Sequence, residues 1–164
     1  MVERVIDAIT RARELIENVK RTNAPHVLNP LTGPFSHEST HQPHEDFFTS
    51  RVVLRNHPLI KDIEIQANSF GSEVQVLTRE GSKIKPDAAL LAKLAQHGIK
   101  VDRIIHQPVQ KKKGRLPKEV IQTSIYLTKE GEDIGSIHYA PPLKQTLLML
   151  EGKHAEELIR HLLT

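Results

Sequence analysis

Residues 63–76, IEIQANSFGSEVQV, have the pattern of a β-hairpin. On both sides of the Gly-containing segment 70–72, apolar residues alternate one by one with polar residues. Alternation with a period of two is typical of a strand that buries one face, and a short Gly-containing connection joins two such strands in an antiparallel pair. This stretch therefore predicts an antiparallel hairpin, around which we expect further strands.

Further strands are predicted on both sides of this hairpin. Residues 52–54 form a short apolar run before it, and residues 99–105 form another run after it. Two β-rich runs, 120–127 and 134–140, flank the charged, Gly-containing turn at 128–133, which is a second hairpin signal. The sequence thus predicts a mostly antiparallel sheet of about five to six strands.

Three segments are predicted to be helical. Residues 2–20 place apolar side chains at steps of three and four, with charged residues between them. Pro86 and Asp87 are typical of a helix start, and Gly98 of a helix end. After Pro141 and Pro142, leucines from 143 to 162 also keep helical spacing. We expect a single α+β domain in which two to three helices pack the sheet.

The chain divides into three parts. Residues 1–21 form the N-terminal amphipathic helix, residues 22–48 a long irregular arm with four prolines, and residues 49–164 the α+β core. The apolar stripe of the first helix can dock on its own domain, which is the favoured interpretation, or form a homodimer contact. If helix and arm serve assembly, the remainder from residue 49 should fold without them.

The composition excludes several classes of chemistry. The chain of 164 residues has no cysteine, which removes disulfides, thiolate nucleophiles, iron–sulfur clusters and cysteine-type zinc sites. No segment has the apolar length of a membrane span, and the N-terminus lacks the apolar core of a secretory signal. We therefore expect a cytoplasmic protein without a membrane partner and without a bound cofactor, and the net charge of +3 is compatible with anionic partners.

The densest charge in the sequence lies between two predicted strands. A Gly- and Pro-containing loop carries five cations within eight residues. Cations in such a loop can contact several phosphates and release counterions, with little readout of sequence. We predict that the protein binds nucleic acid or another polyanion there, with two arginines of the first strand extending the patch. The predicted binding residues are Lys111, Lys112, Lys113, Arg115, Lys118, Arg51 and Arg55.

A second candidate site lies in the arm, where residues 37–46 read HESTHQPHED. His37, His41 and His44 supply imidazole groups that can bind a divalent metal or act as a general base, and three carboxylates accompany them. Pro43 opposes the helix on which this spacing would bring the three rings together. The sequence also shows no nucleophile elbow, phosphate-binding glycine loop or second metal motif.

Three functions follow from these features. The first is an intracellular binding protein that engages a polyanion through its basic loop. The second is a metal-assisted or histidine-dependent hydrolase or nuclease that uses the 37–46 cluster. The third is an oligomeric assembly or adaptor protein that uses the N-terminal helix and the arm. The sequence leaves open whether the protein is an enzyme.

Overall fold

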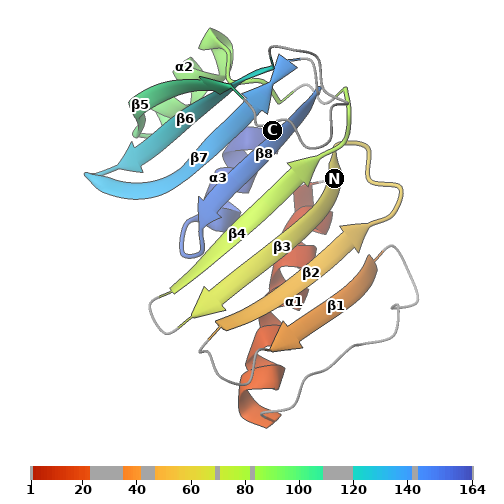
Figure 1. The fold of residues 1–164 in the computed structure, drawn as a ribbon. Helices are drawn as coiled ribbons and strands as arrows, with labels where there is room; N and C mark the ends of the chain where they lie inside the picture. The colour runs from red at the N-terminus through yellow and green to blue at the C-terminus, as the bar shows by residue number, and fades with distance from the viewer. Residues whose placement is uncertain are drawn as a thin grey trace.

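Eight antiparallel strands form one open sheet in the computed structural model, and three helices pack on one face of it (Figure 1). This agrees with the predicted α+β class, although the expected five to six strands were too few. Among the described residues, no helix has both the length and the apolar character needed to cross a membrane. The structure describes residues 2–22, 35–41, 47–68, 71–81, 84–108, 120–141 and 144–163.

The chain uses one arrangement of elements twice. A helix followed by four strands occurs first as α1 and β1–β4 and then as α2 and β5–β8, and α3 closes the chain. The strand order β1-β2-β3-β4-β8-β7-β6-β5 joins the halves through an antiparallel pair of β4 and β8. The elements are α1 Val2–Thr22, β1 Phe35–His41, β2 Phe47–Leu54, β3 Ile60–Asn68, β4 Gly71–Thr78, α2 Ala88–Gln96, β5 Ile99–Pro108, β6 Ile121–Lys129, β7 Glu132–Ala140, β8 Gln145–Glu151 and α3 Ala155–Leu163.

Both predicted hairpins are confirmed. In the first, β3 pairs with β4, and Ile65 lies opposite Val74 with both side chains fully buried. In the second, β6 pairs with β7 around Glu130 and Gly131, whose φ angles are 54° and 78°. Two successive residues with positive φ match the right-handed twist of the strands that they connect, which explains the Gly at this turn.

The N-terminal helix docks on its own domain, as the favoured interpretation predicted. One side of α1 packs on β2 and β3 and contacts α3 (Figure 1). Val5, Ala8, Ile9 and Ala12 on this side have no exposed surface. The apolar stripe of α1 is therefore part of the core, and whether the protein forms a homodimer stays a prediction.

The predicted helix over the leucines from 143 to 162 was wrong in its first half. Gln145–Glu151 form β8, a central strand, and only Ala155–Leu163 are helical. In β8, Leu148 and Leu150 are fully buried on the helix-covered face, while Leu147 and Met149 lie on the opposite face. Apolar residues on both faces of a strand give a continuous apolar run, whose leucines happened to match a helical spacing.

The predicted irregular arm was also wrong in part. Phe35–His41 form β1, which pairs with β2 at one edge of the sheet, and β2 itself begins at Phe47. Six of the seven residues of β1 are Ser, His, Glu or Thr, so the strand has no apolar alternation that sequence reasoning could detect. The other residues of the arm lie outside the described part of the chain.

Candidate binding surface on the open face of the sheet

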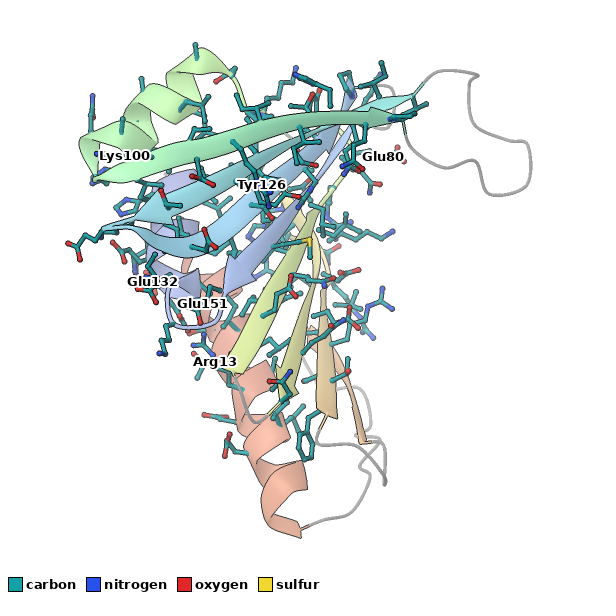
Figure 2. All side chains as sticks on the ribbon, turned by 60° about the vertical axis from the view of Figure 1, so that its left-hand side comes forward. Arg13, Glu80, Lys100, Tyr126, Glu132 and Glu151 are labelled. Atoms are coloured by element: carbon teal, nitrogen blue, oxygen red, sulfur yellow. The ribbon has the colours of Figure 1, made fainter. Side chains whose placement is uncertain are left out.

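The sheet face opposite the helices has no described element packed on it (Figure 2). One row of paired residues runs across this open face from β5 to β8: Arg103, Tyr126, Ser136 and Met149. The neighbouring row, Ile104, Ile125, Ile137 and Leu148, points to the helices because successive residues of a strand face opposite sides. Polar side chains therefore gather on the open face of the second half.

His138 is the centre of a hydrogen-bond network on this face. Its Nδ1 lies 2.7 Å from the hydroxyl oxygen of Ser124, and its Nε2 lies 2.8 Å from that of Ser136. Gln122 approaches Nδ1 at 3.4 Å. Burial disfavours the imidazolium and lowers the pKa of His138 below its ordinary value of 6.5. His138 is therefore neutral at pH 7, with one serine donating to the ring and the other accepting from it.

The network does not have the features of a hydrolase centre. The contact of Ser136 with His138 has the distance of a nucleophile–base pair. However, Nδ1 meets the hydroxyl of Ser124, whereas a catalytic imidazolium is normally stabilised by a carboxylate. Ser136 is also only 7% exposed. The arrangement fits a fixed polar surface better than a catalytic site.

Acidification should weaken the fold through His138. Because its folded pKa is lowered, the unfolded chain binds a proton first as the pH falls below about 6.5, and the free energy of unfolding decreases. The decrease ends below the pKa of the folded state. Urea unfolding at a series of pH values should show a steeper pH dependence for the wild type than for His138→Gln. Parallel curves for the two proteins would contradict this role, since His161, whose pKa is also lowered, is present in both.

At one end of the open face, carboxylates surround a hollow of about 620 Å³. The Arg103 guanidinium lies over the Tyr126 ring at 4.2 Å from its centroid. Burial raises the pKa of Glu73 in the wall of the hollow. Among the described residues, no three His, Cys, Asp or Glu side chains could hold a metal ion. The carboxylates that line the hollow are Glu73, Asp102, Asp133 and Glu151.

At the other end of the same four strands, the strand residues that face the open side are uncharged. This is the end where β5 stops at Pro108 and β6 starts at Ile121, so the connection 109–120 leaves from it. Asp102 and Pro108 are six residue steps apart along β5, which corresponds to about 20 Å. Glu80 lies at this end too (Figure 2), where the Gly81 amide donates to the Lys144 carbonyl. The open-face residues here are Ile105, Gln107, Gln122, Ser124, His138, Ala140 and Gln145.

Of the seven predicted basic residues, the structure describes two, Arg51 and Arg55. Lys111, Lys112, Lys113, Arg115 and Lys118 lie outside the described residues, but the strands on either side locate their connection. Arg51 lies on β2 and makes an ion pair of 2.9 Å with Asp62. Arg55 follows β2, and its carbonyl accepts a hydrogen bond from Arg4. Because β2 is five strand steps from β6, or about 24 Å, the structure does not bring these two arginines to the base of the basic connection.

The predicted histidine cluster is not tested. His37 and His41 lie on β1, but their side chains are outside the described part of the chain, as is the whole of His44. A metal site or a histidine-dependent hydrolase at this place therefore stays a prediction.

Sequence reasoning missed the residues of the open face. Ser124, Tyr126, Ser136 and His138 alternate with apolar residues in two strands that were predicted, which was a usable signal. That alternation shows which side chains point away from the core, but it cannot show that no helix covers that side.

Comparison with known proteins gives no family. No model of a protein family matches the chain, and neither a curated protein nor a solved structure matches it. The fold and surface therefore define its class in structural terms alone. It is an α+β protein in which helices cover one sheet face, while no described element packs on the other.

Proposed function

We propose that this protein binds nucleic acid or another polyanion through the basic connection between β5 and β6, defined as residues 109–120. Five cations within eight residues supply the charge. The connection leaves the sheet at the end of an edge hairpin, where an extended ligand can approach without meeting other strands on the outer side.

The separation of charge along β5–β8 carries this proposal. Carboxylates of the open face in this half gather around the hollow, about 20 Å from the basic connection. Beside the connection, the open face presents neutral groups such as Gln107 and Gln122. A phosphate bound by the cations would therefore meet hydrogen-bond donors and would be repelled by few carboxylates.

The mechanism is electrostatic docking. Each lysine or arginine that neutralises a phosphate releases a counterion, and amide groups of glutamines can donate to phosphate oxygens without reading the bases. If all five cations of the connection contact phosphates of a duplex, the logarithm of the association constant should change with the logarithm of salt with a slope of about −4.5. Sequence preference should be weak.

Fluorescence anisotropy with labelled duplex and single-stranded oligonucleotides at several salt concentrations tests the proposal. Changing Lys111, Lys112, Lys113 and Arg115 to alanine should weaken binding about 100-fold at low salt and make the slope shallower. The control removes the same charge from exposed lysines elsewhere, with Lys61, Lys85, Lys100 and Lys153 changed to alanine.

Two outcomes would overturn the proposal. One is the absence of binding at low salt for the wild type. The other is an equal loss in the two quadruple variants, because net charge and not the basic connection would then determine affinity.

A further inference from the structure

We infer that β5 is a docking surface for β5 of a second copy of this chain, so that two sheets join edge to edge. The first observation is where apolar surface is exposed. Among the described residues, the exposed large apolar side chains are Val101, Ile104 and Ile121, at 37%, 49% and 51% exposure. All three lie on the β5–β6 hairpin, which forms one edge of the sheet.

These side chains lie on the helix-covered side of the sheet. Val101 is paired with Leu127 and Ile104 with Ile125, and both partners are buried in the core. Ile121 has the same parity on β6 as Ile125. The exposed apolar patch is therefore continuous with the core, but it extends beyond the helices that cover the core.

Unequal helix lengths explain why this patch is uncovered. In the first half of the fold, α1 has 21 residues and packs along β2 and β3. In the second half, α2 has nine residues, or about 13 Å, against ten residues of β5, or about 33 Å. In the second half, α2 is therefore too short to cover most of the outer strand β5.

The backbone of β5 is also available on one side. As the last strand of the sheet, β5 pairs with β6 only, so its outer N–H and C=O groups have no strand partner among the described residues. Such an edge accepts another strand unless charges or bulges prevent it. β5 has both features, with Lys100, Asp102 and Arg103 in its first half and a bulge between Val101 and Arg103.

The charges and the bulge favour one self-pairing. With a two-fold axis between Asp102 and Arg103, antiparallel pairing sets Asp102 opposite Arg103 of the second copy, and the reverse. The extra residue of the bulge places both side chains on the open face, where both line the hollow. The same register sets Val101 opposite Ile104 of the second copy on the helix-covered face. Like charges never lie directly opposite each other.

We assign a second copy of the chain as the partner because the charge pattern of β5 is complementary to itself in this register. A foreign strand would need the same order of acid, base and apolar residues. The end of β5 that adjoins the basic connection carries no acidic residue. Antiparallel pairing places this end next to the acidic end of β5 in the second copy. The inference does not rest on polyanion binding, and either proposal can fail without the other.

Charge reversal on the full chain tests the dimer by sedimentation over micromolar to near-millimolar concentrations. Asp102→Arg and Arg103→Asp each place two pairs of like charges across the axis and should each weaken dimerisation about 30-fold or more. The double variant Asp102→Arg/Arg103→Asp restores opposite charges and should bring the dissociation constant back to within about threefold of wild type. Lys61→Glu, on an exposed residue of β3, should leave it unchanged.

Ile104→Ser provides a second test that changes no charge, and it should also weaken the dimer. Urea midpoints close to wild type establish that each variant is folded. A wild-type chain that is monomeric throughout the concentration range would overturn the inference, and a foreign strand would then be the remaining occupant. A dimer that the single reversals do not weaken, or that the double reversal does not restore, would overturn it equally.

Discussion

Replacing Ile9 with aspartate should leave the chain unfolded under conditions in which the wild type is folded. Ile9 has no exposed surface and lies on the side of α1 that packs on the sheet. The change loses the burial of a large apolar side chain, about 3 kcal/mol, and adds a desolvated carboxyl group without a partner at a cost of several kcal/mol. A domain with an ordinary free energy of unfolding, about 5–15 kcal/mol, loses most of that free energy through this substitution. Circular dichroism and urea unfolding measure the effect.

The matched control is Glu14→Ala, five residues further along the same helix. Glu14 is exposed, so its truncation should change the free energy of unfolding by less than about 0.5 kcal/mol. If Ile9→Asp unfolds at the urea concentration of the control, α1 does not contribute to the cooperative core. The same reasoning opposes the idea that residues 49–164 fold alone, because Val52, Ile63 and Ile65 beneath α1 would be exposed to water.

Much of the fold was predictable because local chemistry and tertiary structure agree in both hairpins and in α2. Asp87 caps α2 by accepting a hydrogen bond of 2.9 Å from the Leu90 amide, and Gly98 follows the helix with a φ of 77°. These signals act within a few residues, so sequence alone contains them.

The failures occur where the environment and not the local pattern determines the structure. β8 is predicted as a helix because its position in the centre of the sheet makes both of its faces partly apolar. β1 is missed because it is an edge strand with polar side chains. In both cases the partner strand is distant in sequence, and no local signal specifies it.

The candidate surface was predictable only in part, for a similar reason. The density of cations in the basic connection is a property of eight consecutive residues. The gathering of Glu73, Asp102, Asp133 and Glu151 at one end of the sheet depends instead on the order of strands from four different places in the chain. The charge separation that supports polyanion binding could therefore be found only in the structure.

Gly152→Val should lower the free energy of unfolding by about 3 kcal/mol, because the position has no room for a side chain. A Cβ there would overlap the Ser72 hydroxyl and lie 2.9 Å from the Ser72 carbonyl oxygen, to which the Gly152 amide donates a 2.8 Å hydrogen bond. The Gly152 carbonyl also accepts from Arg13, whose guanidinium contacts Glu156 of α3. One glycine thus connects the end of β8 with β4 and α1.

A double-variant cycle with Ser72→Gly separates this steric cause from a general loss of strand stability. Removing the Ser72 side chain eliminates the overlap with the hydroxyl and the 3.2 Å contact with Cβ but keeps the carbonyl contact. Gly152→Val should therefore cost clearly less in the Ser72→Gly background than in the wild type, with a coupling of about 1 kcal/mol or more. Equal costs in the two backgrounds, measured from urea midpoints, would show that the contact with β4 does not determine the need for glycine at this position.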